Sequence, residues 1–371
     1  MRLFLALLAS ALLLSADANF EQALTIDPTK CGTGDSTDFP TLVHLSANNF
    51  KLRANGGLVE NASGYDIRFW SDPGRTTALA WSIDYYDGVN GVVWAWAKNG
   101  TVSHSAPGTV FYVSIGDPTI STFQSTAAAV WSNGYVLVWH GGGASLSLAD
   151  SSSNAFAIAN SATPVTTTSG KIAGGAAFAA ASSEFLAVDT DPAALQPAVL
   201  SVSTWVNYTS TTGTRYVLAK TGNGYRIFGL NGGTSLVGSV RDSAGTDTQI
   251  NFGNNLNNGA WRQLVMTFDA TASGTGALKA YLNASPITPV NAVNTGGIKY
   301  TAGSMQIGAV GGATFWDGAL DEIEIRNLVS PPEWVTTAFN NQNAPDSFLT
   351  PGALFAATPP AGSASLLGVG R

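Results

Sequence analysis

The chain has 371 residues, of which 11% are charged and 45% hydrophobic, and its formal net charge is -7. This length gives room for two domains that each bury a core, while an acidic chain without a Lys/Arg cluster excludes nucleic acid and anionic membrane surfaces as partners. The 41 glycines, together with abundant Trp, Tyr and Phe, favour an all-β protein with many turns.

Residues 1–18 have the pattern of a secretory signal peptide. Arg2 supplies a positive charge, Leu3 to Leu14 is an apolar run too short for a stable membrane anchor, and Ala16-Asp-Ala18 has the form of a cleavage site. No later segment reaches the length of a transmembrane helix, and the single cysteine, Cys31, indicates neither a disulfide framework nor a lipid anchor. We therefore predict a mature protein without a membrane span that is secreted, or held at the cell surface or in the periplasm.

Residues 22–129 are predicted to form a small β-sandwich, because short segments with strand periodicity alternate with Asp-Pro-Gly and Asp-Gly turns. The ordered motifs D-F-P-T-L-V, G-Y-D-I-R-F, W-S-I-D-Y-Y, V-W-A-W and F-Y-V-S-I-G-D-P resemble a bacterial and phage domain of uncharacterised function. That domain commonly precedes a laminin-G-like jelly roll. The predicted strands are Thr37–Leu45, Tyr65–Phe69, Leu79–Tyr85, Val92–Ala97 and Val110–Ile115.

Residues 130–348 are predicted to form a second, larger β domain. Strand periodicity recurs in short segments separated by turns rich in Gly, Asn and Pro, which is typical of a two-sheet sandwich or jelly roll. In the last segment Glu322, Glu324 and Arg326 alternate with Ile323 and Ile325, which predicts one wet face and one dry face. The predicted strands include Tyr135–His140, Leu200–Val206, Gly224–Phe228, Trp261–Asp269, Leu278–Leu282, Ser304–Gly308 and Leu320–Asn327.

The second half of the chain resembles the laminin-G-like, concanavalin A-like jelly roll of secreted bacterial and phage proteins. The resemblance rests on W-x-x-L-V-x-T-F-D, L-x-x-Y-L-N, M-x-I-G and F-x-D-G-x-L-D-E-I-x-I-x-N, which follow one another from Trp261 to Asn327. These are packing motifs and carry no chemistry. The implied fold is all-β, with a small N-terminal β-sandwich followed by the jelly roll.

The jelly roll is predicted to end with one short helix. Ser330-Pro-Pro-Glu333 has the form of a capping box, and Trp334, Ala338 and Phe339 follow at helical spacing. Residues 349–371 are rich in Ala, Pro, Gly and Ser, and we expect them to form a disordered tail.

Candidate catalytic residues are few. His44, His104 and His140 are isolated in the sequence from each other and from any Cys or paired-acid motif, so no zinc-ligand spacing exists. Some retaining glucanases share the predicted fold and use two carboxylates about 5 Å apart. Here only Glu322 and Glu324 approach that pattern, and we disfavour catalysis because Arg326 shares their face. Asp321 has the parity of Ile323 and Ile325, so we expect it to face inward and to bond to the backbone.

Laminin-G-like folds often hold a calcium ion at the rim of the sandwich, so the resemblance implies calcium as a possible cofactor, and none is required. Asp242 and Asp247 bracket an Ala-Gly turn and Asp317 lies in another loop, which offers the oxygen ligands that Ca²⁺ prefers. The favoured alternative is that each aspartate caps its own turn.

Four residues are candidates for stacking on, or hydrogen bonding to, a sugar. Trp94 and Trp96 share one face of their strand, and Trp205, with the parity of Asn207, is placed to line the concave sheet. The favoured alternative for the tryptophans is packing in the core.

These observations predict a secreted, non-catalytic binding or adhesion protein with glycans as the ligand class. One alternative is a structural component of an extracellular or virion assembly. The other is a polysaccharide-cleaving glycosidase, for which Glu322→Gln or Glu324→Gln would abolish hydrolysis. The main prediction requires that no deep groove carries convergent acids or imidazoles at its floor.

Overall fold

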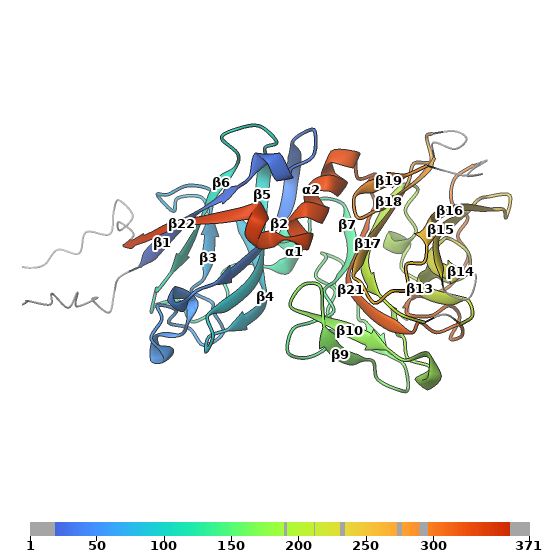
Figure 1. Ribbon diagram of the computed structural model, residues 1–371, viewed down its shortest axis with the longest axis horizontal. Helices are drawn as coiled ribbons and strands as arrows, with labels where there is room; N and C mark the ends of the chain where they lie inside the picture. The colour runs from blue at the N-terminus through green and yellow to red at the C-terminus, as the bar shows by residue number, and fades with distance from the viewer. Residues whose placement is uncertain are drawn as a thin grey trace, which may run out of the picture.

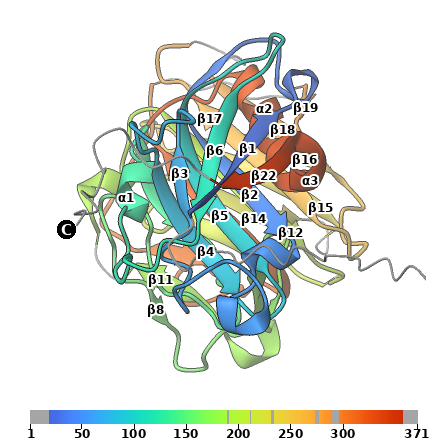
Figure 2. The same ribbon diagram turned by 90° about the vertical axis from the view of Figure 1, so that its left-hand side faces the viewer.

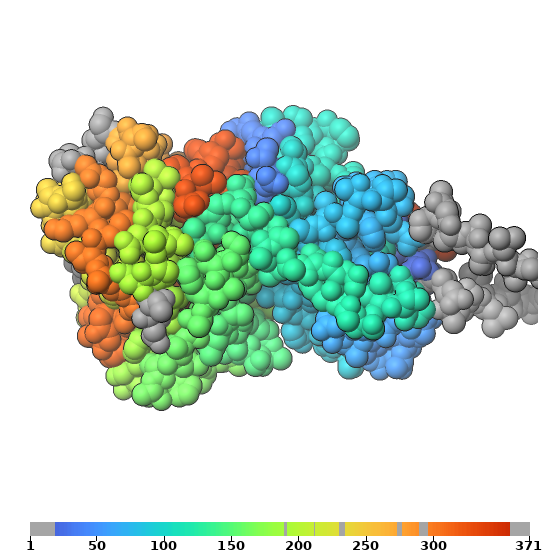
Figure 3. Space-filling model, turned by 180° about the vertical axis from the view of Figure 1, so that it is seen from behind, coloured from blue at the N-terminus to red at the C-terminus, as the bar shows by residue number. Residues whose placement is uncertain are grey.

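The computed structural model describes residues 19–188, 191–210, 212–230, 234–272, 277–288 and 296–356. The predicted signal peptide lies outside these residues. The described chain is nearly all β and forms two β-sandwiches that lie side by side along the long axis of the molecule (Figure 1), as the sequence predicts. Seen from behind, the two sandwiches are in broad contact (Figure 3). No helix in the described residues is long and apolar enough to cross a membrane.

The first sandwich contains two antiparallel sheets with the strand orders β22-β1-β6-β3 and β2-β5-β4. Large apolar side chains from both sheets, such as Phe39, Phe69 and Phe111, are fully buried between them. The strands are β1 (Phe20–Ile26), β2 (Ser36–Ser46), β3 (Arg68–Trp70), β4 (Ala80–Asp87), β5 (Val92–Val102), β6 (Val110–Ile115) and β22 (Leu349–Ala356).

Strand β22 corrects the predicted disordered tail for residues 349–356. It runs antiparallel to β1, with Ile26 opposite Leu349 and Phe20 opposite Ala356 (Figure 2). The composition of the segment does not favour order by itself, but the edge of β1 offers unpaired backbone groups, and Leu349 is buried in the first sandwich. Residues 357–371 lie outside the described residues.

The second sandwich is the predicted jelly roll, and its described part contains an eight-stranded and a seven-stranded sheet. The larger sheet has the order β19-β18-β17-β12-β21-β10-β9, with β7 also paired to β21. Its strands are β7 (Tyr135–Trp139), β9 (Thr166–Ser169), β10 (Gly174–Phe178), β12 (Leu200–Asn207), β17 (Arg262–Phe268), β18 (Leu278–Leu282), β19 (Ser285–Ile287) and β21 (Gly318–Arg326).

The smaller sheet has the order β16-β15-β14-β13-β20-β11-β8. Leu264, Met266 and Phe268, which share the apolar face of β17 in the sequence, lie in the core between the two sheets. The strands of the smaller sheet are β8 (Ala159–Asn160), β11 (Leu186–Val188), β13 (Arg215–Lys220), β14 (Tyr225–Leu230), β15 (Ser235–Arg241), β16 (Asp247–Asn254) and β20 (Met305–Ile307).

The predicted C-terminal helix is present as α2 (Pro332–Asn343), followed by the single turn α3 (Pro345–Phe348). The predicted capping box does not form, because Pro331 is the N-cap residue and the Ser330 hydroxyl instead accepts a hydrogen bond from Arg326 Nη1 (2.8 Å). The other helical segments are α1 (Ala127–Val130) and the 3₁₀ turns η1 (Pro28–Lys30), η2 (Asn48–Phe50), η3 (Arg53–Asn55), η4 (Ala180–Ser182) and η5 (Ala193–Leu195).

Helix α2 lies between the two sandwiches (Figure 1). On one side, the Asn341 side chain accepts from the backbone N–H of Leu42 (2.7 Å) and donates to its carbonyl (2.9 Å), which satisfies the edge of β2. On the other side, Gln342 accepts a hydrogen bond from Trp205 Nε1 (2.7 Å) of the jelly roll. The helix therefore covers a sheet edge of one sandwich and a sheet face of the other.

The core of the first sandwich continues across this boundary. Trp131, Val138 and Ile172 are fully buried in the same apolar cluster as Phe39 and Trp96, although Val138 belongs to a strand of the jelly roll. We call this region, between sheet β2-β5-β4 and the outer face of the eight-stranded sheet, the seam.

Candidate functional site

A β-bulge in β21 decides which side chains reach the seam. Ser203 of β12 lies opposite Glu324, but Trp205, two residues on, lies opposite Asp321, and Glu322 has a φ of 48°. The extra residue turns Asp321 to the same face as Glu324. The predicted inward parity of Asp321 is therefore wrong, while Ile323 and Ile325 do face the jelly-roll core.

The prediction that Asp321 bonds to the backbone is confirmed. Its Oδ2 accepts from the N–H groups of Lys171 (2.8 Å) and Ile172 (2.9 Å), in the turn that leads into β10. Gly170 allows this approach, because a Cβ there would lie 2.6 Å from the same oxygen. The carboxylate therefore ties that turn to β21.

The face predicted to be wet is buried at the seam. Glu322, Glu324 and Arg326 are 0%, 6% and 5% exposed, because α2 and the first sandwich cover them. Glu324 accepts from Gln342 Nε2 (3.0 Å), and the Arg326 guanidinium lies 4.2 Å from the centre of the Trp334 ring. Alternation along one strand shows two faces but not what covers each of them.

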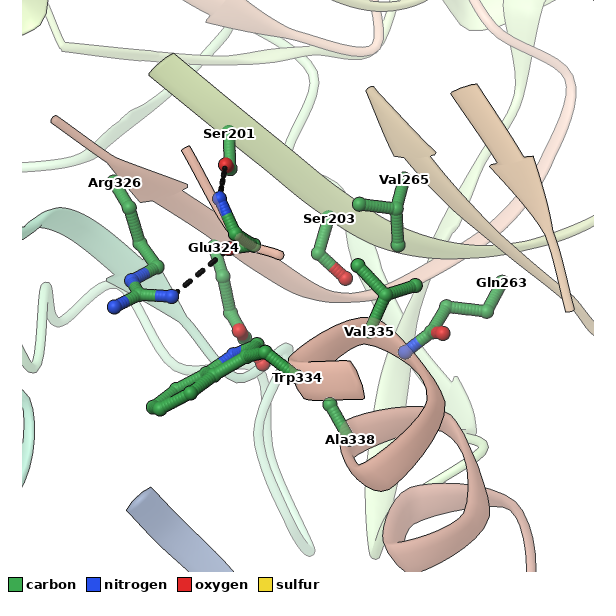
Figure 4. A pocket seen from close by; sticks show the side chains of 10 residues that line it. Ser201, Ser203, Gln263, Val265, Glu324, Arg326, Trp334, Val335 and Ala338 are labelled. Atoms are coloured by element: carbon green, nitrogen blue, oxygen red, sulfur yellow. Dashed lines mark hydrogen bonds between the residues drawn. The ribbon is translucent and has the colours of Figure 1, made fainter. Parts of the chain in front are cut away.

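Glu324 lines a small cavity between α2 and the outer face of the larger sheet (Figure 4). Its volume is about 20 Å³, which suits one water molecule and is far too small for a sugar ring. This geometry does not support the Glu322 and Glu324 pair as the acid and nucleophile of a glycosidase, because a polysaccharide cannot reach either carboxylate.

Three ionisable side chains from distant segments meet in the seam, and we call them the seam cluster: Asp84 on β4, His140 after β7 and Glu322 in the bulge of β21. His140 Nδ1 lies 2.8 Å from Glu322 Oε2, and one potential ligand atom from each residue lies within 4.8 Å of the others. His140 is isolated in the sequence, but the fold brings it beside two acids. The cluster has no short-range sequence signal, since His140 and Glu322 are 182 residues apart.

Burial and mutual charge set the proton affinities in the cluster. Burial raises the pKa of the Asp84 carboxyl, and the neighbouring His140 only partly offsets this effect. Burial alone would lower the pKa of His140, but the carboxylates of Glu322 and Asp84 outweigh it and raise that pKa. Burial likewise raises the pKa of Glu324 to about 7, and it raises that of Asp321 well above its usual range.

Asp84 also lines a solvent-open hollow on the first sandwich, which we call the tyrosine hollow. Its volume is about 480 Å³. The side chains of Tyr65, Tyr85 and Phe123 are half-buried around it, and Tyr65 and Phe123 meet edge to face with ring centres 5.8 Å apart. The remaining lining residues are Ala62, Ser63, Ser82, Ile83, Tyr86 and Ala127. Neither Tyr65 nor Tyr85 has a hydrogen-bond partner for its hydroxyl group among the described residues, whereas the Tyr86 hydroxyl donates to the carbonyl of Phe50 (2.9 Å).

The residues predicted to contact a sugar do not form one surface. Trp205 is 1% exposed and stacks on Phe339, and Trp96 is 1% exposed beside Trp131 in the seam. Trp94 is half-buried and stacks on His44, with ring centres 4.0 Å apart. Asn207 is half-buried at the end of β12. The two buried tryptophans stabilise the contact of the sandwiches and present no ring to solvent.

The calcium candidates lie in separate environments. Asp247 is paired with Arg226 and Arg241. Asp242 accepts a hydrogen bond from the N–H of Thr246 (2.7 Å), so it caps its own turn, which is the alternative to calcium binding. Asp317 is half-buried and 4.0 Å from the Arg215 guanidinium. In the part of the chain that the structure describes, the seam cluster is the group of three His, Cys, Asp or Glu residues close enough to share one ion. Calcium binding stays a prediction.

The other two histidines each pair with one aspartate nearer the surface. His44 Nδ1 lies 2.7 Å from Asp346 Oδ1, and His104 Nδ1 lies 2.6 Å from Asp35 Oδ1. Among the described residues, neither pair has a third His, Cys, Asp or Glu close enough to share an ion.

Comparison with known proteins identifies the second sandwich. Residues 182–336 match the family model of the concanavalin A-like lectin/glucanases superfamily. That match does not reach residues 22–129, so the resemblance of this segment to an uncharacterised bacterial and phage domain stays a prediction. A search of curated proteins gave no match to the chain.

Three similar solved structures illustrate the range of matches. The binding domain of paraclostridial mosquitocidal protein 1 is 13% identical over 56% of this chain and 52% of that one, with a TM-score of 0.45. The ligand-binding domain of botulinum neurotoxin serotype D, in complex with N-acetylneuraminic acid, is 12% identical over 58% and 53%, with a TM-score of 0.46. The matched region spans about half the length of these two toxin domains.

The third structure is domain 4 of an extracellular arabinanase from Geobacillus stearothermophilus, in complex with arabinotriose. It is 19% identical over 54% of this chain and 96% of that domain, with a TM-score of 0.42. On the evidence of its motifs, its two sheets and the match at residues 182–336, the second sandwich of this all-β protein is a concanavalin A-like jelly roll.

Proposed function

We propose that the protein is a non-catalytic binding protein that recognises glycans through the tyrosine hollow. The observation that carries the proposal is the lining of that hollow, where aromatic rings, free phenol hydroxyls and one carboxylate surround a space open to solvent. Pockets for small ligands have this composition, with apolar walls and a few polar groups that fix orientation.

The chemistry of the lining suits a sugar. A pyranose has apolar C–H faces that pack on aromatic rings, and Tyr65, Tyr85 and Phe123 provide such rings. Its hydroxyl groups need donors and acceptors, which the hydroxyls of Tyr65 and Tyr85 supply. The predicted secretion of the chain would place this hollow where extracellular glycans are available.

Binding without hydrolysis follows from the position of the carboxylates. Glycoside hydrolysis normally needs two carboxyl groups flanking the scissile bond. Asp84 lines the hollow, whereas Glu322 is 0% exposed and hydrogen-bonded to His140 behind it. The convergent groups therefore lie mostly inside the seam, and the hollow itself presents one acid.

The first experiment is a glycan array with the purified mature chain, with and without calcium, followed by calorimetric titration of each glycan that binds. We expect Tyr85→Ala to weaken binding at least tenfold and Tyr85→Phe to weaken it less, because the latter keeps the ring and loses only the hydroxyl. Tyr216→Ala is the matched control, since Tyr216 is a half-buried tyrosine of the jelly roll that stacks on Phe228.

Three outcomes would overturn the proposal. Equal affinity of the Tyr85→Ala and Tyr216→Ala variants would place the site elsewhere. Release of shortened products from a bound polysaccharide would show an enzyme. Self-association in light scattering, without any glycan that binds, would favour the structural alternative.

A further inference from the structure

We propose that the seam cluster of Asp84, His140 and Glu322 binds one first-row divalent cation, with Zn²⁺ as the best match. Asp84 belongs to the first sandwich, whereas His140 and Glu322 belong to the jelly-roll sheet. An ion held by all three would fasten the two sandwiches to each other. This role is separate from glycan binding, although Asp84 borders both sites.

The spacing of the three residues suits a metal ion. One potential ligand atom from each lies within 4.8 Å of the other two. Zinc bonds to nitrogen and oxygen of about 2.0–2.2 Å hold the ligand atoms about 3.4 Å apart in a tetrahedral site. Three protein ligands would leave the fourth position for water.

Each of the three residues has a buried polar atom without a hydrogen-bond partner. These atoms are His140 Nε2, Glu322 Oε1 and Asp84 Oδ2. His140 is 6% exposed and Glu322 is 0% exposed, so bulk water does not satisfy them. Buried polar side-chain atoms nearly always have a partner, so unsatisfied atoms on three neighbouring side chains indicate that the seam cluster holds a bound group.

The charge of the surroundings also indicates a cation. The negative charge of Glu322 raises the pKa of both Asp321 and Glu324, and Asp84 adds a fourth acid to this buried region. His140 is the basic group that is hydrogen-bonded within the cluster. Burying several acids beside one imidazole costs free energy. A doubly charged ion would offset the negative charge that the carboxylates carry.

The donor set selects the class of metal. One imidazole and two carboxylates suit Zn²⁺ and its first-row neighbours, whereas Ca²⁺ and Mg²⁺ prefer oxygen ligands only. The ion also has a path of entry, because Asp84 lines the tyrosine hollow, which opens to solvent.

The test compares zinc binding by variants of the full mature chain. Protein stripped with a chelator is titrated with Zn²⁺, and the bound metal is measured by mass spectrometry and the melting temperature by calorimetry. We expect one Zn²⁺ per chain and a rise of several degrees in melting temperature, because a ligand that binds only the folded state stabilises it. Co²⁺ in place of Zn²⁺ should give the visible absorption of a nitrogen and oxygen site.

Two substitutions should abolish this binding. Asp84→Asn and His140→Gln are each expected to lose the bound ion and the shift in melting temperature. His104→Gln is the matched control, since His104 also lies beside a carboxylate, Asp35 (2.6 Å), but belongs to no group of three such ligands in the described part of the chain. If His140→Gln does not fold, Asp84→Asn still tests the proposal. Asp84 borders the solvent-open hollow, so its substitution should disturb the fold less.

The proposal is overturned if the wild-type chain takes up no Zn²⁺, or if both variants bind it as tightly as the His104→Gln control. The result is independent of the glycan proposal. Tyr85→Phe should keep the ion whatever happens to glycan affinity, and a chain that binds no glycan should still take up one Zn²⁺.

Discussion

At the scale of single residues, Cys31 shows how burial controls reactivity. The side chain lies beside η1, half-buried, with its Sγ 3.8 Å from the carbonyl of Asp27. Burial, helped by the negative charges of Asp27 and Asp35, raises the pKa of the thiol to about 11. The thiolate is the reactive form, so this cysteine should be chemically quiet at neutral pH.

We therefore predict slow labelling of Cys31 by a thiol reagent at pH 8. A thiol with a pKa of about 11 has about 100-fold less thiolate at pH 8 than one with the ordinary value of 9.0, so the folded chain should react about 100-fold more slowly than the chain in urea. The rate should rise about tenfold per pH unit until the pH approaches 11, because deprotonation limits it over that range. A plateau of the rate below pH 9 would contradict the prediction.

At the scale of elements, β22 and the bulge of β21 are features that a local pattern does not show. β22 completes the sheet of the first sandwich after the chain has passed through the whole jelly roll. The bulge turns Asp321, Glu322 and Glu324 toward the seam and makes the cluster with His140 possible. Both features depend on partners that are distant in sequence.

Removal of β22 should destabilise the protein. A chain ending at Phe348 exposes the edge of β1 and loses the buried side chain of Leu349, so we expect a melting temperature lower by several degrees and a tendency to aggregate. A chain ending at Ala356 is the control and should keep its melting temperature. Equal melting temperatures of the two chains, measured by calorimetry, would show that β22 contributes nothing to stability.

At the scale of the whole molecule, the two sandwiches share one buried seam. Trp131, Val138 and Ile172 extend the apolar core of the first sandwich into the contact with the jelly roll, and α2 hydrogen-bonds to both. Independent domains are usually joined by smaller and more polar contacts. The first sandwich contains both β1 and β22. Because β22 follows the jelly roll in the chain, the first sandwich cannot be complete until the whole jelly roll has been synthesised.

We therefore predict a single cooperative unfolding transition for the mature chain. In scanning calorimetry the calorimetric and van't Hoff enthalpies should agree, and tryptophan fluorescence and far-ultraviolet circular dichroism should report the same midpoint. Two separated transitions would mean that the seam does not couple the sandwiches.

Much of the fold could be predicted from the sequence because strand period and turn residues are local. Val110–Ile115 and Leu278–Leu282 are strands with the predicted bounds, and Leu264, Met266 and Phe268 lie in the core as their alternation indicates. The predicted helix after Ser330 is also present. These features depend on neighbours within a few residues along the chain.

The candidate sites could not be predicted in the same way. The alternation of Glu322, Glu324 and Arg326 indicated a solvated face, but a second sandwich covers it. Tyr65, Tyr85 and Phe123 meet in one hollow through the packing of separate segments, and none of them stood out in the sequence. Trp205 was a sugar-binding candidate from the sequence, but α2 hydrogen-bonds to its indole nitrogen and buries its ring.

The sequence by itself determined that this is an all-β protein with a concanavalin A-like jelly roll, because alternation and turn chemistry are encoded over short distances. Only the tertiary structure decided which polar faces are buried, where β22 pairs and which acids lie beside His140. Those outcomes depend on contacts between segments up to hundreds of residues apart, and periodicity along one strand carries no information about them.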